Sequence, residues 1–433
     1  MFKKTIISEF FTTVSLNQAF QSLYLMTFWS YKLRFWAESD LLEKELLKKI
    51  TGQTQRSAPT EKNVGVNLCV HPKIISFYNW RSAIFHALKM IWVDSEDEVI
   101  VNAYNCVSVS NAVIQSWAKI IYSDIEEETL SFDFEVLKTN ISPKTKVIII
   151  QHTFWKEARD YKEIIKLAKE KNILVIEDCA HSLWNNTEIL GDFVIFSTGR
   201  DKVISSVTWW FLIINNKNYF NKIDGIKNSL KMPSVLLTLK NLNYNIVWYK
   251  AYKFYDFLKL WKIIIFLSRK LNFITEILTP NEKACNFDNF YLKLPNSLAY
   301  LALKELEKLE EYTNDRLKKS INYLENINNN SFDILFEDLD NYNWFRFPIL
   351  LNSEEEKEKL YKIARKNNIL LWNQWSGQNI IPIWTSFEKA KYKVWSCPVS
   401  ENISKRILTL PNHKLITKKD LEKVVNILNN FNK

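Results

Sequence analysis

Glycine is scarce in this chain: its 433 residues include only 6 Gly, whereas a typical composition of roughly 7% would give about 30. Tryptophan is abundant instead, with 16 residues, several in turn-like contexts such as Asn79-Trp80-Arg81-Ser82 and Thr208-Trp209-Trp210-Phe211. Glycine supplies a positive φ and lets backbone approach a ligand closely, and an indole can do neither at low cost. We therefore hypothesise that many of these Trp are glycine in the native host, encoded by a UGA codon that the host reads as glycine. A chain that is simply rich in tryptophan is the alternative.

Cysteine is also scarce and scattered. The five residues are far apart and form no CxxC pair, which argues against a zinc centre and against a disulfide framework. We predict no metal. A reducing compartment, the cytoplasm, fits this use of cysteine.

Charge of one sign is not concentrated anywhere in the chain. There are 58 Lys+Arg and 48 Asp+Glu, a net charge of +10, and basic residues come in runs of only a few. This pattern is typical of a solvated basic surface and speaks against nucleic-acid binding.

The most membrane-like stretch is Leu258–Leu267, within segment 245–275. It is interrupted by Lys259 and Lys262 and is much shorter than the ~20 residues that a spanning helix needs. A buried or surface amphipathic helix is the plainer interpretation. Contact with the inner face of a membrane stays open, because bulky apolar residues alternate there with lysines.

What the chain does contain is a regular alternation of short apolar runs and helical stretches. Its 47% of hydrophobic residues can bury a large core, and its length indicates two domains. Strands that alternate with helices of this length favour an α/β fold, in which helices cover both faces of a mostly parallel sheet in three αβα layers. The predicted strands are Glu98–Val101, Lys119–Tyr122, Lys146–Ile150, Ile173–Ile176 and Phe193–Ile195, with helices up to Ser116 and over Asp160–Lys171.

The other segments predict an arm, an insertion and a second domain. Residues 1–70 are expected to form a helical arm with a polar linker around Thr51–Asn63, and the aromatic-rich stretch 225–290 an irregular insertion. A long helix is expected from Ser297 to about Asn326, and a last amphipathic helix over Lys418–Phe431. The predicted boundaries are 1–70 for arm and linker, 71–296 for the large domain and 297–433 for a smaller α+β domain.

Polar residues gather at the ends of predicted strands and at one helix start. Asp178 follows one strand, Ser197 and Lys202 follow the next, and Arg81-Ser82 precedes a helix. Each is a weak signal alone, since a strand-end Asp is more often a cap and a Lys between charged neighbours is usually solvated. Pyridoxal phosphate, however, needs a lysine amine, a carboxylate that keeps its ring nitrogen protonated, and a helix N-terminus with hydroxyls for its phosphate. Because ligands of such sheets bind at the carboxyl ends of the strands, these residues together predict a site for that cofactor.

The order and spacing of several motifs resemble one family. From about Ser76 to the C-terminus the chain looks like the DegT/DnrJ/StrS-type sugar aminotransferases, pyridoxal-phosphate enzymes with the aspartate-aminotransferase fold (fold type I). The arm and the 225–290 insertion match less well. The matching stretches are Asp97-Glu98-Val99-Ile100-Val101, Tyr104-Asn105-Cys106, Ile141-Ser142-Pro143-Lys144-Thr145-Lys146, Val175-Ile176-Glu177-Asp178-Cys179-Ala180-His181-Ser182, Gly191-Asp192, Phe196-Ser197 through Lys202, Leu294-Pro295-Asn296, Cys397-Pro398-Val399-Ser400-Glu401 and Leu410-Pro411.

The resemblance implies a role for each candidate residue. Lys202 would form the Schiff base and shuttle the proton, and Asp178 would pair with the pyridinium nitrogen. His181 would lie against the cofactor ring or its phenolic oxygen. Ser197, with the backbone around Arg81-Ser82, would hold the phosphate.

Several positions depart from the family pattern. Lys293 falls where some relatives place an Asn that reaches a neighbouring subunit's phosphate, and a cation could serve there. Cys106 stands where an aromatic residue commonly stacks on the ring. Active sites between two protomers imply a homodimer. The pattern also expects glycine at nine positions that carry tryptophan here: Trp80, Trp92, Trp117, Trp155, Trp184, Trp209, Trp210, Trp372 and Trp395.

The resemblance implies amino transfer in polysaccharide biosynthesis. An amino acid, glutamate in our prediction, would give its amino group to a keto group of a nucleotide-linked deoxysugar. One alternative is a PMP-dependent sugar dehydratase of the same fold, but those relatives typically replace the lysine with histidine, so Lys202 favours transfer. The other is a non-catalytic, membrane-associated or regulatory homologue, which segment 245–275 and Cys106 would suit. The sugar, the aminated carbon and the nucleotide are not specified, and Asn373–Ser376 is one guess at a substrate loop.

Overall fold

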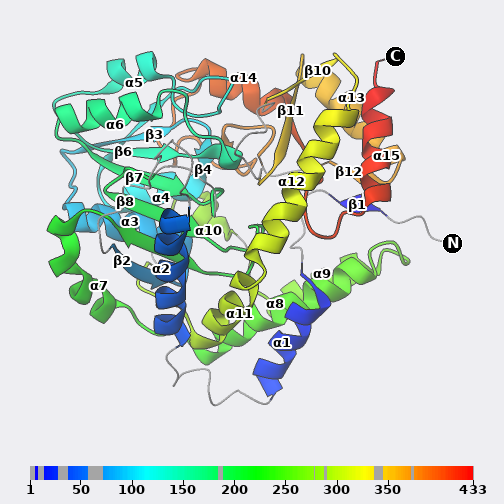
Figure 1. Ribbon diagram of the computed structural model, residues 1–433, viewed down its shortest axis with the longest axis horizontal. Helices are drawn as coiled ribbons and strands as arrows, with labels where there is room; N and C mark the ends of the chain where they lie inside the picture. The colour runs from blue at the N-terminus through cyan, green and yellow to red at the C-terminus, as the bar shows by residue number, and fades with distance from the viewer. Residues whose placement is uncertain are drawn as a thin grey trace.

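A seven-stranded sheet is the centre of the larger part of the molecule (Figure 1). Five strands, from β5 to β8, pair in parallel, and β9 and β2 extend one edge in the antiparallel sense. In spatial order the strands are β2 (Lys73–Phe77), β9 (Trp210–Ile214), β8 (Phe193–Ser197), β7 (Leu174–Cys179), β6 (Thr145–Gln151), β3 (Glu98–Asn102) and β5 (Lys119–Ser123). The computed structural model describes residues 5–7, 14–27, 38–56, 72–183, 189–276, 278–286, 290–335, 345–371 and 375–432.

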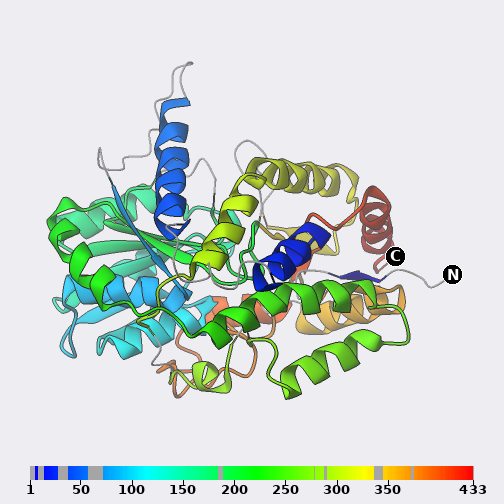
Figure 2. The same cartoon turned by 90° about the horizontal axis from the view of Figure 1, so that it is seen from below.

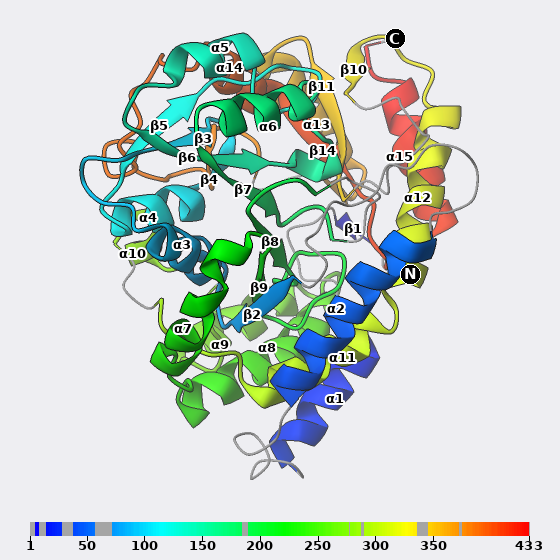
Figure 3. The same cartoon turned by 60° about the vertical axis from the view of Figure 1, so that its left-hand side comes forward.

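Helices cover both faces of this sheet. They are α3 (Trp80–Ile91) and α4 (Val107–Gln115) on one side, and α5 (Phe134–Asn140) and α6 (Tyr161–Glu170) on the other. Side chains alternate along a strand, so Val99 and Val101 of β3 pack toward α3 and α4, whereas Ile100 packs toward α5 and α6. Figure 3 shows the same three layers with α6 on one side of the sheet and α3 and α4 on the other. The predicted α/β class with a mostly parallel, covered sheet is confirmed.

The predicted strands of the large sheet are confirmed with small shifts. One shift concerns the candidate site: β7 runs on to Cys179, so Asp178 lies within the end of the strand, where it pairs with Ile195 of β8, and not in the turn after it. The apolar run ends at Ile176, but the backbone ladder continues through polar side chains. Hydrophobicity marks the apolar part of a strand and misses last residues that are polar although they are buried.

The N-terminal arm is helical, as predicted. Helix α1 (Leu16–Thr27) packs on α8 (Val235–Lys253), and α2 (Glu38–Arg56) packs on α11 (Asn296–Leu306). The expected linker around Thr51–Asn63 is wrong in its first part, since α2 continues to Arg56; its remainder lies outside the described residues. A short strand before α1, β1 (Ile6–Ile7), pairs with β12 (Ile369–Leu370) near the other end of the chain.

The 225–290 insertion is helical, and the expectation of irregular structure is wrong. After the 3-10 helix η3 (Lys217–Lys222) it forms a hairpin of α8 with α9 (Leu260–Lys270), between α7 (Ile223–Ser229) and the short α10 (Pro280–Lys283). The sequence hid this because the buried face of α8 includes Thr238, Asn241 and Asn245, which breaks the apolar periodicity. Among the described helices, none combines the length and the apolar character that crossing a membrane requires.

The long helix expected from Ser297 to Asn326 is two helices. α11 ends at Leu306 and α12 begins at Leu309, with Glu307-Lys308 between them. α12 leads to a three-stranded antiparallel sheet in the C-terminal part (Figure 1), and the boundary at 297 stays a prediction. The sheet consists of β10 (Phe332–Ile334), β11 (Phe347–Leu351) and β14 (Ile407–Leu410). The helices of this part are α13 (Glu354–Lys366), α14 (Pro398–Arg406) and α15 (Lys418–Asn429). A separate short strand, β13 (Ile380–Ile381), pairs with β4 (Asn105–Cys106) of the larger part.

Tryptophan occupies backbone that favours glycine. A positive φ is rare for bulky residues, yet Trp92, Trp117, Trp155, Trp384 and Trp395 have φ of 61°, 74°, 89°, 77° and 67°. Trp92 is the left-handed C-cap of α3, a position where glycine is usual. Four of the five belong to the nine expected glycine positions, and Trp384 is an addition. These angles support the recoding hypothesis, which stays a prediction; Trp184 and Trp372 lie outside the described residues.

Candidate active site

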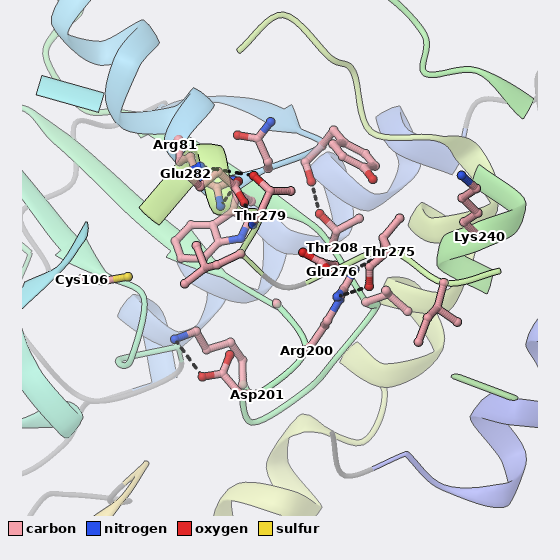
Figure 4. A pocket seen from close by; sticks show the side chains of 18 of the residues that line it. Arg81, Cys106, Arg200, Asp201, Thr208, Lys240, Thr275, Glu276, Thr279 and Glu282 are labelled. Carbon is pink, nitrogen blue, oxygen red and sulfur yellow. Dashed lines mark hydrogen bonds and ion pairs between the residues drawn. The ribbon is translucent and has the colours of Figure 1, made fainter. Parts of the chain in front are cut away.

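A cavity of about 460 Å³ lies beyond the carboxyl end of β8, a size typical of small-molecule sites. Three parts of the chain form its walls (Figure 4). The large domain contributes Arg81, Cys106 and the segment Gly199–Lys202; the insertion contributes Lys240, Arg269, Thr275 and Glu282; the C-terminal part contributes Trp375 and Ile381.

Lys202 reaches this cavity from the turn after β8. Its backbone N–H donates to the Gly199 carbonyl (3.1 Å), and the Gly199 N–H donates to Ser197 Oγ (3.0 Å). The amine is buried, 3.9 Å from Asp201 Oδ2 and 5.1 Å from the centre of the Phe345 ring. Burial lowers the pKa of Lys202 more than the neighbouring Asp201 raises it. The neutral amine, the form that attacks a carbonyl carbon, is therefore more abundant than for an ordinary lysine.

Asp178 lies close to this amine. Lys202 lowers the pKa of Asp178 and Asp178 raises that of Lys202, so the structure brings the two predicted catalytic groups together. The carboxylate is buried and accepts a hydrogen bond from the Ala180 N–H (3.0 Å). Burial dominates and raises its pKa. A buried carboxylate of this kind favours a protonated nitrogen beside it, because that cation stabilises the charged form.

Replacement of Asp178 by Asn is expected to stabilise the protein without cofactor at neutral pH. The folded-state pKa is raised, so the carboxylate opposes folding as the pH rises above the ordinary Asp value of 3.8. We expect D178N to gain about 0.5–2 kcal/mol of unfolding free energy at pH 7 and to lose the gain near pH 4, while it binds pyridoxal phosphate less tightly. Urea unfolding at both pH values measures this, and a variant that is less stable at pH 7 would contradict the assignment.

His181 presents a neutral imidazole to the site. Its ring lies between Phe154 and Phe345, with centroids 5.6 and 4.7 Å away, and meets the edge of Trp375 at 4.7 Å. Burial lowers its pKa well below the usual range. Nδ1 accepts the Phe154 N–H (3.3 Å), which leaves the proton on Nε2. His181 can therefore donate one hydrogen bond, through Nε2–H, to a group bound beside it.

The N-terminus of α3 provides the anion-binding end of the cavity. Asn79 caps the helix by accepting the Ser82 N–H (3.1 Å), and the Ser82 hydroxyl also donates to Asn79 (2.9 Å). Arg81 lines the cavity but forms a buried ion pair with Glu282 of α10. Arg81 thus lies at the cavity with its charge paired to a carboxylate, and the Ser82 hydroxyl is engaged in the cap, so the role of Arg81 and Ser82 in holding a phosphate stays a prediction.

Lys293 does not join this group within one protomer. Its backbone N–H donates to the Lys231 carbonyl (2.9 Å) beside β2, and its side chain is not part of the cavity wall. The role that the resemblance suggests for it concerns a neighbouring subunit and stays a prediction. Cys106 does line the cavity, so no aromatic ring occupies that position of the wall.

Sequence reasoning missed three charged residues of the site. Asp201 Oδ2 lies 3.2 Å from the guanidinium of Arg346, a residue that is 1% exposed. Although burial raises the pKa of Asp201, Lys202 and Arg346 outweigh it and lower the pKa, so Asp201 stays anionic beside the amine. Glu282 is the third. The sequence does hold a signal for Arg346, because this one charged residue interrupts the apolar run Phe345–Leu351. Its partner Asp201 lies 145 residues earlier, so the ion pair itself leaves no local signal.

One buried group in the described residues has the spacing of a metal site. It consists of His152, Glu177 and Cys179, beneath Asp178. Hydrogen bonds account for much of it: Glu177 pairs with His152 Nε2 (2.9 Å) and accepts the Tyr161 hydroxyl (2.8 Å). Burial lowers the pKa of His152, but the hydrogen bond and the charge of Glu177 raise it by more, so the net pKa of His152 is raised. The positive charge of protonated His152 in turn lowers the pKa of Asp178. The geometry therefore supports a role in holding Asp178 ionised.

The residues of the cavity wall and the buried groups close to Lys202 fit pyridoxal phosphate. Lys202, a partly neutral amine, lines the cavity, the buried Asp178 carboxylate and the His181 imidazole lie close enough to feel its charge, and Arg81 at the start of α3 lies at the wall. Lys202 would hold the aldehyde carbon, Asp178 the ring nitrogen, His181 the ring or its oxygen, and Ser197 with the start of α3 the phosphate.

Comparison with known proteins gives matches over most of the chain. The model of the DegT/DnrJ/EryC1/StrS aminotransferase family matches residues 61–198 and 284–429, and the stretch between them holds Lys202 and most of the insertion. GDP-perosamine synthase of Escherichia coli O157:H7 is 21% identical over 364 residues, 82% of this chain and 84% of that protein.

Solved structures match at low sequence identity. Helicobacter pylori PseC, an aminotransferase involved in the biosynthesis of pseudoaminic acid, has a TM-score of 0.67 at 15% identity and covers 98% of this chain and 98% of its own. Bacillus subtilis NtdA with bound cofactor PMP has a TM-score of 0.65 at 17% identity and covers 96% of this chain and 82% of its own. These likenesses show the fold.

Proposed function

Because the chain belongs to the DegT/DnrJ/EryC1/StrS aminotransferase family, we propose that it moves the amino group of an amino acid, glutamate in the simplest case, to a keto group of a nucleotide-linked deoxysugar. The family and the enzyme class expected from the sequence, a pyridoxal-phosphate-dependent aminotransferase, are confirmed. Relatives such as GDP-perosamine synthase support a sugar as the acceptor. The donor, the sugar and the nucleotide belong to the proposal.

The observation that carries this proposal is the nearness of the buried Asp178 carboxylate to the Lys202 amine, which lines the cavity. Bound pyridoxal phosphate supplies an electron sink for the α-carbon of the amino donor. Lys202 would take the proton from that carbon and return it on the acceptor side. Asp178 would keep the ring nitrogen protonated, and His181 would donate its Nε2 proton to the ring oxygen.

Asp201 and Arg346 position the amine in this account. Lys202 must alternate between a neutral and a protonated form, and Asp201 offers a partner 3.9 Å away for the protonated form. Arg346 holds Asp201 in place at 3.2 Å and keeps it from becoming protonated by lowering its pKa. The pair would therefore give the protonated Lys202 a resting partner.

The two alternatives from the sequence are less well supported. A dehydratase of the same fold would be expected to carry histidine at position 202, where this chain has lysine. A non-catalytic homologue would have no need to keep the Lys202 amine, the Asp178 carboxylate and the His181 imidazole buried near one another, because each buried ionisable group costs free energy.

Incubation with glutamate, pyridoxal phosphate and a panel of 3-keto and 4-keto nucleotide sugars tests the proposal. Without sugar, we expect at most about one 2-oxoglutarate per enzyme molecule, because the amino group stays on the cofactor. With the right sugar, we expect many 2-oxoglutarate molecules per enzyme molecule, because each transfer frees the cofactor for another turn. Mass spectrometry of the sugar should show an oxygen replaced by an amino group. A sugar that loses water and gains no nitrogen would support the dehydratase, and no 2-oxoglutarate at all would contradict transfer from glutamate.

We propose a homodimer in the cytoplasm as the working form. Insertion residues of the same protomer form one wall of the cavity, and in the proposed dimer Lys293 of each protomer would approach the phosphate end of the other. Contact of segment 245–275 with the inner face of the membrane is a separate proposal that needs no catalysis.

A further inference from the structure

Helix α9 has apolar side chains on two opposite faces. Ile264 and Ile265 pack toward α8, as part of the cluster that joins the hairpin to the arm. Ile263, Phe266 and Leu267, spaced at i, i+3 and i+4, are 53%, 61% and 46% exposed on the other side. The hairpin forms the lower edge of the molecule in Figure 2, with α9 outermost. An exposed apolar stripe opposite the packed face of a helix is a candidate contact surface, so a partner is expected on this outer face.

The apolar surface extends beyond the helix at both ends. Leu258 before it and Leu271 and Phe273 after it are 72%, 56% and 54% exposed. These six large side chains fall within one short segment, and we call them the α9 face. Six large apolar side chains exposed within 16 residues are typical of an interaction site.

The charges within the segment of the α9 face are all positive, and the first acids beyond its two ends are Asp256 and the exposed Glu276. Lys259, Lys262, Arg269 and Lys270 are exposed, and the sequence from residue 257 to residue 275 contains no Asp or Glu. The nearest acid before it, Asp256, accepts a hydrogen bond from the Thr5 N–H (2.8 Å) and so faces the arm. The ammonium group of Lys270 lies 5.9 Å from the centre of the Phe266 ring; its stem can therefore follow apolar surface while its charge stays in water.

This combination decides between two occupants. A second copy of the chain, related by a two-fold axis, would place these cations against the same cations, which disfavours a self-complementary contact. An anionic lipid surface offers an apolar layer for the side chains and phosphates for the lysines. We infer that the α9 face docks on an anionic phospholipid bilayer, with α9 parallel to the surface.

The same helix also touches the active-site cavity. Arg269, near the end of α9, and Asn272, just after it, line the cavity. Docking of the α9 face would therefore hold the cavity next to the bilayer. The inference does not depend on the proposed reaction, because it rests on exposure and charge outside the catalytic groups.

Vesicle flotation of the full chain loaded with pyridoxal phosphate tests the inference. We expect binding to vesicles of phosphatidylcholine with phosphatidylglycerol and little binding to phosphatidylcholine alone, with release at high salt. Removal of two cations in Lys259→Gln/Lys262→Gln should weaken partitioning about 30-fold, since each cation near an anionic surface contributes about fivefold. Phe266→Ser should weaken it roughly tenfold or more.

Matched controls keep the test specific. Lys418→Gln/Lys419→Gln removes two exposed lysines from the start of α15, and Phe20→Ser removes an aromatic side chain of α1 that is 67% exposed. Both should bind anionic vesicles as the parent does. The inference is overturned if the parent ignores anionic vesicles, if the controls lose binding as the α9 variants do, or if Phe266→Ser instead changes the oligomeric state in sedimentation.

Discussion

Replacement of Lys202 by Arg or by Ala is expected to lower kcat by about 10²–10⁴-fold or more, because the group that transfers the proton is lost. Arg keeps a positive charge beside Asp201 but offers no neutral amine at this pH. Both variants should lose the visible absorbance band of the covalently held cofactor. Circular dichroism would show that the fold is intact, since Lys202 contributes a charge and no part of the apolar core.

The pair of variants separates a catalytic from a structural role. Ala leaves space at the end of the cavity, so small amines such as methylamine should restore part of the activity of Lys202→Ala. They should not restore Lys202→Arg, whose side chain fills that space. An Arg variant with the activity of the parent would show that charge alone matters at this position and would contradict the assignment.

Glycine at the exposed positive-φ positions is expected to raise stability markedly. A residue with a side chain pays about 1–2 kcal/mol for left-handed backbone, and replacement by glycine removes this cost. Glycine also makes the unfolded chain more flexible, which takes back roughly 0.5–1 kcal/mol of the gain in stability. Changing Trp92, Trp117, Trp384 and Trp395, each 72–75% exposed, to Gly should therefore add about 2–4 kcal/mol of unfolding free energy in sum, less about 1–2 kcal/mol for the cation–π contacts that two of these indoles make. Denaturant unfolding measures it.

The effect should differ between the four sites. Lys222 lies over the ring of Trp92 and Lys405 over that of Trp395, at 5.1 and 5.5 Å, and each such contact is worth about 0.5–1 kcal/mol. Trp117 carries no such offset in the described contacts and should show the gain most clearly. A matched change in helical backbone, Trp261→Gly in α9, should destabilise instead by about 1 kcal/mol or more.

Trp155 lies outside this prediction although it has the largest φ of the five. It is fully buried, and its indole N–H lacks a hydrogen-bond partner in the described structure, as does that of Trp209. An unsatisfied buried donor costs about 1–3 kcal/mol, but the loss of a buried indole costs about 3–5 kcal/mol when the cavity does not close. Mass spectrometry of peptides from the native host tests the recoding hypothesis directly. Glycine at positions 80 and 209 would support the hypothesis, and tryptophan at either position would refute it.

The central sheet and the strand-end positions of Asp178 and Lys202 could be predicted because they leave local signals. Buried parallel strands are continuous apolar runs, and Asp178, Ser197 and Lys202 follow two of them within a few residues. The insertion could not be predicted as helical, since α8 buries Asn241 and Asn245 where periodicity demands apolar residues.

The outer wall of the site could not be predicted either. Glu282 meets Arg81 and Arg346 meets Asp201 only through tertiary folding, across long stretches of sequence. Single charged residues of this kind look the same in sequence whether they are solvated or buried. Their partners become visible only when the fold brings distant segments to one cavity.

Borohydride reduction of the enzyme with bound pyridoxal phosphate, followed by peptide mass spectrometry, tests the central claim most directly. The account predicts one modified peptide, with the added phosphopyridoxyl mass on Lys202. Label on a different lysine in a protein that binds the cofactor, or tight binding without any covalent label, would contradict it.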